Sequence, residues 1–188
     1  ITIPRVLIGT DPEVFLRSKS TGKFVSAHGQ FPGTKEEPFA LDRGALQVDG
    51  HALEFNTDPV ASENEFVFVV NHVFNQVKGY VEATNPDWEI ALEPVARFDR
   101  AYFDELPEES KVLGCTPDFS AITGVQLSSP EIGHTPIRTG SGHIHIGWTE
   151  FDDPFDKREF EKRFILANRI TPHLLKVAKK WETPDSTE

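Results

Sequence analysis

ALQVDGHALEFNT, residues 45–57, holds two short runs typical of β-strands on either side of Asp49-Gly50. Asp-Gly is a strong signal for a two-residue hairpin turn, although the same pair could also mark a bulge within one long strand. Shortly after it, Ser62 and Glu65 form a capping box that predicts a helix over residues 62–83. The apolar side chains of this helix recur at helical spacing at Phe66, Val69, Val70, Val73, Phe74, Val77 and Val81. A hairpin followed by an amphipathic helix predicts a sheet with a helix on one of its faces.

The segments on either side of this region add the remaining elements. Further strands are expected over residues 6–16, 23–27, 88–98 and 142–148, the first two of which would form a hairpin. Residues 28–44 indicate a loop because glycine and proline interrupt them, and residues 99–111 indicate a loop or a short helix. A second helix is expected over residues 156–181, where Pro172 should kink or split it. We therefore expect an α+β fold in which helices pack on one face of an antiparallel sheet.

Composition excludes several classes of protein. The chain has 188 residues, 15 of them Phe, which suits a single domain over residues 1–188 with a substantial core. Its formal net charge of -11 disfavours binding to nucleic acid or to an anionic membrane surface. No apolar run approaches the ~20 residues that would span a bilayer. The single cysteine, Cys115, excludes an internal disulfide and a Cys-rich zinc module, and a small buried thiol is its expected role.

Two groups of acidic residues are candidates for a cation site. Asp11 and Glu13 stand two residues apart in an expected strand, so both carboxylates should lie on one face. Glu54 and Asn56 share a strand face in the same way, close to Asp49. Paired carboxylates repel each other unless water or a cation lies between them, and acid and amide oxygens are ligands that Mg²⁺ prefers. Half-exposed strand faces with no ligand are the alternative interpretation.

Histidine, arginine and lysine supply the other candidate groups. The run GSGHIHIG, residues 140–147, places His143 and His145 on one face of a strand, where they could bind a metal or a phosphate. Arg138 lies five residues before His143 and could contact an anion. Lys35 follows a glycine turn and could hold a phosphate, although the spacing is not that of a Walker loop. Solvated histidines and an ordinary surface lysine are the alternatives.

The His-x-His pair also occurs in other enzyme classes. A barrel amidohydrolase would need about 250 residues, more than this chain has. A cupin would need glycines where Ile137 and Lys157 stand, and further strands where this chain is expected to be helical. No Gly-x-Ser-x-Gly elbow and no His-Glu-x-x-His pair is present.

Taken together, the motifs resemble one known family over residues 6 to about 150. They occur in the family's order as GTDPEVF (9–15), PGTK (32–35), DGHALEFN (49–56), GCTPD (114–118) and residues 138–147. The family is the phage carboxylate–amine ligases of the phiEco32 type, the second of its two types. It belongs to the superfamily of glutamine synthetase and glutamate–cysteine ligase.

This resemblance implies a fold, a reaction and roles for particular residues. It implies a glutamine-synthetase-like antiparallel sheet whose concave face holds metals, ATP and substrate. ATP would phosphorylate a substrate carboxylate, and an amine would attack the acyl phosphate to give an amide, with Mg²⁺ or Mn²⁺ as cofactor. The implied metal ligands are Asp11, Glu13, Glu54 and His143. The implied catalytic residues are Glu54, Arg138 and His145, and those facing ATP are Lys35, Arg138 and His145.

The C-terminal part departs from this family. Nothing after Gly147 resembles the family's final Glu-Tyr-Arg segment, so we expect that segment to be lacking. The alternative function is therefore a catalytically weakened member that serves as a structural or binding component of a phage. The expected partners are a small-molecule or peptide carboxylate and amine, with a homo-oligomer or a virion component as further possibilities. The expected location is the host cytoplasm, with the virion as the alternative.

Overall fold

A computed structural model gives the structure of the chain and describes residues 6–111, 120, 123, 125–126, 135–148, 165–166 and 168–173. The chain divides into two compact units, one of residues 1–114 and 131–149, the other of residues 115–130 and 150–188. In the second unit, residues 165–166 and 168–173 are helical, and the rest of the helix expected there lies outside the described residues, as does Cys115. The single-domain assignment stays a prediction.

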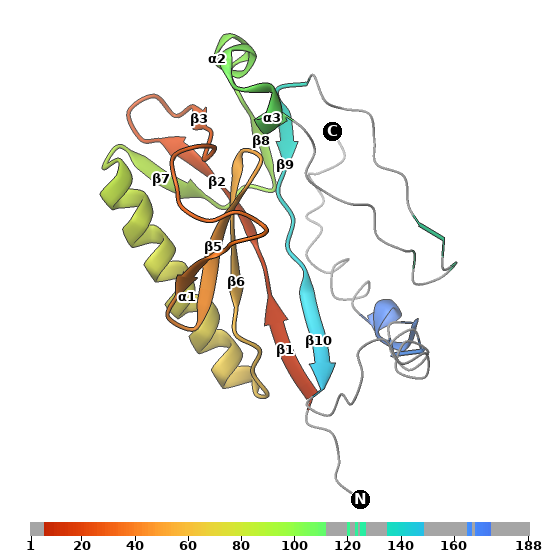
Figure 1. Cartoon of the computed structure of the whole chain (residues 1–188). Coiled ribbons are helices and arrows are strands. Elements are labelled where there is room, and N and C mark those ends of the chain that lie inside the picture. Colours follow the sequence, from red (N-terminus) through yellow and green to blue (C-terminus); the bar gives the residue numbers. More distant parts are fainter. Residues whose placement is uncertain are drawn as a thin grey trace, which may run out of the picture. The chain divides into compact units, whose positions relative to one another are not determined.

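The first unit is built on an antiparallel sheet in the order β3-β2-β6-β5-β4, with β7 also paired to β2 (Figure 1). Its strands are β2 (Glu13–Ser18), β3 (Phe24–Val25), β4 (Phe39–Leu41), β5 (Gly44–Asp49), β6 (Ala52–Thr57) and β7 (Trp88–Ala91). Two further antiparallel ladders join β1 (Val6–Thr10) to β10 (Ile144–Trp148) and β8 (Val95–Arg97) to β9 (Ile137–Thr139). The expected α+β class is confirmed.

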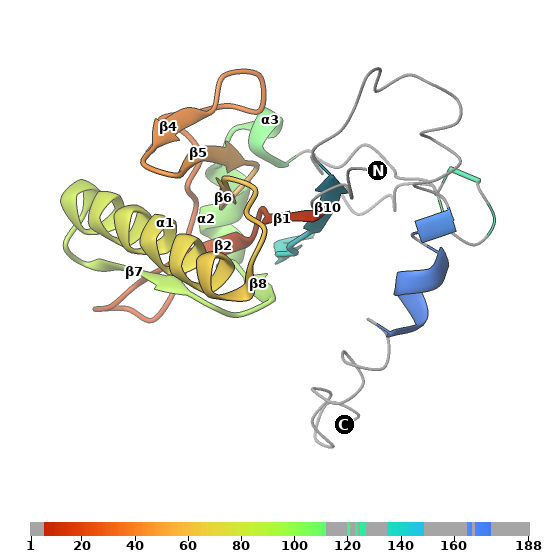
Figure 2. The ribbon, with the colours of Figure 1, turned by 90° about the horizontal axis from the view of Figure 1, so that it is seen from below.

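The long helix α1 (Glu63–Thr84) covers one face of this sheet and lies beside β7 (Figure 2). The Ser62 hydroxyl caps it by accepting from the backbone N–H of Glu65, as the capping box predicts. Its buried valines pack against alternate residues of the strands, in a core that includes Val14, Leu16, Leu46, Leu53, Phe55, Val69, Val73, Val77 and Val81. Among the described residues, no helix is long and apolar enough to cross a bilayer.

A second, smaller core lies on the other face of the sheet. Phe15 alternates with Val14 and Leu16 along β2, and it packs instead with Ala52, Ala96, Phe98 and Phe103. Phe103 belongs to α2 (Arg100–Glu105), which is followed by the short helix α3 (Glu108–Lys111). The sequence led us to expect all helices on one face of the sheet. This expectation is wrong, because α2 packs on the face opposite α1.

Proline explains where the expected strands are interrupted. Residues 6–16 form two strands, β1 and β2, separated at Asp11-Pro12, and residues 88–98 form β7 and β8, separated before Pro94. Proline has no backbone N–H to donate to a ladder, so a continuous paired strand is disfavoured at both places. The expected loop over residues 28–44 also contains the short strand β4.

The buried side chain of His51 should make the stability of the fold depend on pH. The ring is 2% exposed, its Nδ1 shares a hydrogen bond of 2.8 Å with the Ser26 hydroxyl, and its Nε2 has no hydrogen-bond partner. Burial, together with the charges of Arg138, His28 and Lys111, lowers the pKa of His51 to about 4. In the unfolded chain His51 takes up a proton near pH 6.5, whereas in the folded protein it does so only near pH 4. The free energy of unfolding should therefore fall by about 3 kcal/mol between pH 7 and pH 4 on account of this residue.

Urea unfolding of the wild type and of His51→Asn across this pH range tests the prediction. Asparagine can keep the hydrogen bond to Ser26 but does not titrate, so the variant should lose this part of the pH dependence. Lys78→Gln, at an exposed position of α1, is the control and should keep the pH dependence of the wild type because it leaves His51 in place. Equal pH dependence in the wild type and His51→Asn would contradict the prediction.

Candidate functional site

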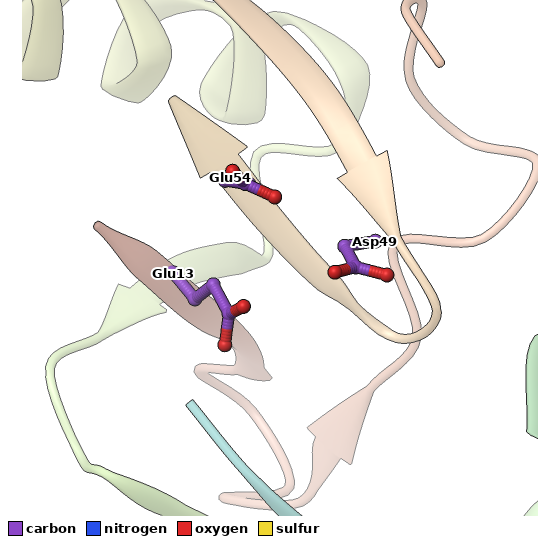
Figure 3. Close-up of side chains that lie close together, drawn as sticks. All are labelled: Glu13, Asp49 and Glu54. Carbon is purple, nitrogen blue, oxygen red and sulfur yellow. The ribbon is translucent and has the colours of Figure 1, made fainter. Parts of the chain in front are cut away.

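Three carboxylates converge from three neighbouring strands of the sheet (Figure 3). Glu13 begins β2, Asp49 ends β5, and Glu54 lies within β6. Glu13 and Glu54 are directly opposite each other in the ladder between β2 and β6. Gln47 is opposite Glu54 on its other side, and Asp49 follows two residues along β5, so it lies diagonally across from Glu54. One carboxylate oxygen of each acid lies within 4.8 Å of those of the other two. We call these residues the carboxylate cluster.

Strand alternation places the carboxylate cluster on the face that α1 does not cover. Val14 and Leu53, the neighbours of Glu13 and Glu54 in sequence, are buried in the core beneath α1. Val48, the neighbour of Asp49, packs against the same core. Because side chains alternate between the faces of a strand, the apolar pattern that anchors α1 also directs the acids to the opposite face. Asn56, two residues after Glu54, lies on this face as well.

The carboxylate cluster is electrostatically unfavourable in the absence of a cation. Burial raises the pKa of Glu54, and the negative charges of Asp11, Asp49 and Glu13 raise it further, although a hydrogen bond with Gln47 acts in the opposite direction. Lys35 partly compensates for this charge, because its ammonium lies 2.8 Å from Oδ2 of Asp49. Carboxylates directly opposite each other destabilise a sheet unless something neutralises them.

Asp11 and the two histidines form a second group beside the carboxylate cluster. Oδ1 of Asp11 accepts from the backbone N–H of His143 at 2.9 Å, and its two oxygens lie 3.1 Å from Nδ1 of His143 and 2.9 Å from Nε2 of His145. Burial would raise the pKa of Asp11, but the hydrogen bonds and charges of the two histidines outweigh burial, so the pKa lies below its usual value. Both rings are more than half exposed. The expectation that the two rings lie on the same side is confirmed by their common partner.

Backbone hydrogen bonds join this second group to the sheet. The backbone N–H of Glu13 donates to the carbonyl of Ser141 at 2.8 Å, and the N–H of Ser141 donates to the carboxylate of Glu13 at 2.8 Å. Gly142 lies close to Pro12, where an added Cβ would come 3.4 Å from its Cα. The chain leading into β10 therefore continues along the beginning of β2, which brings the histidines next to Glu13.

The structure divides the predicted metal ligands between these two groups. Glu13 and Glu54 lie together with Asp49, whereas Asp11 and His143 lie together with His145. Asp49 had no ligand role in the residue set that the resemblance implied, although its position beside Glu54 in sequence had made it a candidate. The Asp-Gly pair predicted a hairpin here, with Asp49 as a turn residue. The turn residues are instead Gly50 and His51, so Asp49 is the last paired residue of β5 and lies on the same face as Glu54.

Arg138 is not directed at the carboxylate cluster in the structure. It is 7% exposed, and its guanidinium donates to the backbone carbonyls of Thr135, Ile137 and Lys111 at 2.6–2.8 Å. The guanidinium also stacks over the ring of Phe103, 4.8 Å from the ring centroid. These contacts tie β9 to the end of α3 and to Phe103 of α2, so in the structure Arg138 serves packing on the face where α2 lies.

The donor set of the carboxylate cluster fits a hard divalent cation. Glu13, Asp49 and Glu54 offer carboxylate oxygens at mutual distances that a single ion could span, and such ligands suit Mg²⁺ or Mn²⁺. No family model, no curated protein and no solved structure matches this chain. The functional assignment therefore depends on the residues and their geometry.

Proposed function

We propose that this protein is an ATP- and Mg²⁺-dependent carboxylate–amine ligase of phage origin. The observation that carries the proposal is the convergence of Glu13, Asp49 and Glu54 on the open face of an antiparallel sheet. The resemblance of the sequence to the phage carboxylate–amine ligases supplies the reaction and the glutamine-synthetase-like arrangement of the sheet. In that reaction ATP transfers its terminal phosphoryl group to a carboxylate, and an amine then displaces phosphate to form the amide.

The residues present can take distinct parts in this reaction. Glu13, Asp49 and Glu54 would hold the divalent cation. When bound, this ion would offset the negative charge of the ATP phosphates. Asp11 fixes the rings of His143 and His145 on one side of β10, where the exposed His145 is available to an anionic ligand. Lys35, at the edge of the carboxylate cluster, supplies a positive charge from the side of β5.

The contacts of Arg138 favour a second candidate function, that of a non-catalytic binding or structural protein. Because its guanidinium is engaged by backbone carbonyls, Arg138 is not available as the phosphate contact that the resemblance implied. A protein that kept the cation site but lost part of its phosphate contacts would serve as a binding or structural component of a phage. Such a protein would bind Mn²⁺ and would not turn over ATP.

Calorimetric titration of ATP with and without Mg²⁺ tests the proposed function. Wild type should bind ATP only with Mg²⁺, and Glu13→Ala should weaken this binding by about tenfold or more, because a carboxylate of the cluster is lost. Glu82→Ala, at an exposed position of α1, is the matched control and should bind as the wild type does. Binding that needs no Mg²⁺, or that survives in Glu13→Ala, would contradict the proposed site. Mg²⁺-dependent binding without ATP turnover in the presence of carboxylates and amines would favour the second candidate.

A further inference from the structure

We propose that Lys35 is a displaceable counter-ion of the carboxylate cluster, which it leaves for an anionic phosphate ligand when a divalent cation binds. This inference rests on the proposed cation site and adds a mechanism that couples cation binding to nucleotide binding. Its starting point is the ion pair of 2.8 Å between the Lys35 ammonium and Oδ2 of Asp49. In the absence of a divalent ion, the ammonium already provides a positive charge at the cluster.

The loop that carries Lys35 is fixed to the strand that carries Asp49. Gly33 adopts a φ of +93°, and an added Cβ would come 2.2 Å from the carbonyl oxygen of Leu46 in β5. Its own carbonyl accepts from the backbone N–H of Val48 at 3.1 Å. Only glycine combines this backbone conformation with such a close approach. The backbone just before Lys35 is therefore held along β5, next to Asp49.

A closed turn then presents the lysine side chain. The N–H of Thr34 donates to the carbonyl of Glu37, and the N–H of Glu37 donates to the Thr34 hydroxyl, both at 3.1 Å. These two hydrogen bonds bracket Lys35 and keep its Cα near the cluster. The motif Pro32-Gly-Thr-Lys35 therefore places a positive charge, at the end of a long flexible side chain, beside the cluster.

The two partners of the ion pair differ in their exposure to solvent. The side chain of Lys35 is 43% exposed, whereas that of Asp49 is 17% exposed. In this proposal the ammonium moves away from Asp49 by rotation of the flexible lysine stem, while the backbone contact of Gly33 stays unchanged. Asp49 stays within reach of Glu13 and Glu54, so its carboxylate remains available to a divalent ion.

Electrostatics makes the ammonium and a divalent ion competitors at Asp49. Both carry positive charge, and at the separations set by a shared carboxylate they repel each other strongly. The competition should weaken cation binding in the absence of nucleotide. An added phosphate would accept the released ammonium, so the same lysine should strengthen nucleotide binding once the cation is in place.

Lys35→Gln tests this coupling because it gives effects of opposite sign in two titrations. With Mn²⁺ alone, the variant should bind about five- to tenfold more tightly than the wild type, because the competing charge is gone. With ATP at saturating Mn²⁺, it should bind about tenfold more weakly, because the phosphate loses a cationic partner. Lys35→Arg, which keeps the charge, should behave like the wild type in the Mn²⁺ titration. Lys23→Gln, which removes an ion pair of 2.9 Å with Asp99 outside the site, is the matched control.

Each other outcome overturns the inference and shows which proposal has failed. If Lys35→Gln binds Mn²⁺ as the wild type does, Lys35 is no competitor, and the cation site remains. If the variant binds both Mn²⁺ and ATP more weakly, the lysine is a permanent structural partner of Asp49. If neither the wild type nor the variant binds Mn²⁺, the proposed cation site fails and this inference fails with it.

Discussion

Glu54→Gln is expected to stabilise the cation-free protein by about 0.5–1 kcal/mol and to abolish its stabilisation by Mn²⁺. In the wild type, burial and the charges of Asp11, Asp49 and Glu13 raise the pKa of Glu54, so the folded state pays for keeping this carboxylate ionised at pH 7. Glutamine keeps the shape and can still bond with Gln47, but it carries no charge. It also removes the central carboxylate of the cluster, and cation affinity should fall by about a hundredfold or more.

The measurement is chemical unfolding at pH 7, once with a chelator and once with Mn²⁺. With the chelator, Glu54→Gln should be the more stable protein. With Mn²⁺ at about 100 times its dissociation constant, the wild type should gain about 2.7 kcal/mol, and the order of stability should reverse. As the pH falls through the raised pKa of Glu54, the advantage of the variant under chelator should shrink, because both side chains are then uncharged.

Two results would contradict this account. If Glu54→Gln is less stable than the wild type under chelator, then Glu54 contributes a favourable interaction to the apo fold and the cluster is not strained. If Mn²⁺ stabilises the variant as much as the wild type, the ion does not bind at Glu54. Glu82→Gln, on the exposed surface of α1, controls for the general effect of a lost negative charge.

The sequence predicted best those parts of the fold that are determined by local patterns. The capping box at Ser62 and the valine repeat placed α1 within a residue or two of its observed ends. Asp49-Gly50 predicted a hairpin here, and the structure has one between β5 and β6, although its two turn residues are Gly50, at a φ of +56°, and His51. Each of these signals lies within a few residues of the structure it determines, so no knowledge of distant contacts was needed.

The arrangement of the site was predicted less completely, because it depends on pairings between distant segments. Asp11 and Glu13 were expected on one strand face, but Pro12 ends that strand, and the two carboxylates join different groups. The contact of Asp11 with the histidines requires residues 141–143 to lie along β2, more than 120 positions away in the chain. Glu13 meets Glu54 through the β2–β6 ladder. Periodicity in one segment carries no information about which other segment will pair with it.

The contacts of Arg138 were also not predicted, because they include distant segments of the chain. Its position five residues before His143, together with the family resemblance, favoured an anion contact. The structure instead pairs Arg138 with Ala96 across the β8–β9 ladder and directs its guanidinium towards Phe103 and the end of α3. Its guanidinium donates to the backbone carbonyls of Thr135, Ile137 and Lys111, and a sequence pattern does not show that these carbonyls will meet at one place.

Arg138→Met is therefore expected to lower the free energy of unfolding by about 3 kcal/mol while leaving ATP affinity in the folded protein unchanged. Methionine fills much of the same volume but donates no hydrogen bond, so the carbonyls of Thr135, Ile137 and Lys111 would lose charged donors in a buried setting. The contact with the Phe103 ring would be lost as well. Urea unfolding measures the first effect, and titration of Mg²⁺·ATP below the unfolding transition measures the second.

Arg97→Met provides the matched control, because Arg97 lies on β8 directly opposite Ile137 and is exposed. It should change stability by less than about 0.5 kcal/mol. Arg138→Lys provides a second variant if Arg138→Met does not fold, since lysine keeps the charge but lacks the planar guanidinium that donates to the three carbonyls. Normal stability combined with lost ATP binding would show that Arg138 is an anion contact after all. Lost stability with normal ATP binding would instead mean that Arg138 is no phosphate contact and that it secures β9, the strand that precedes the His-x-His segment.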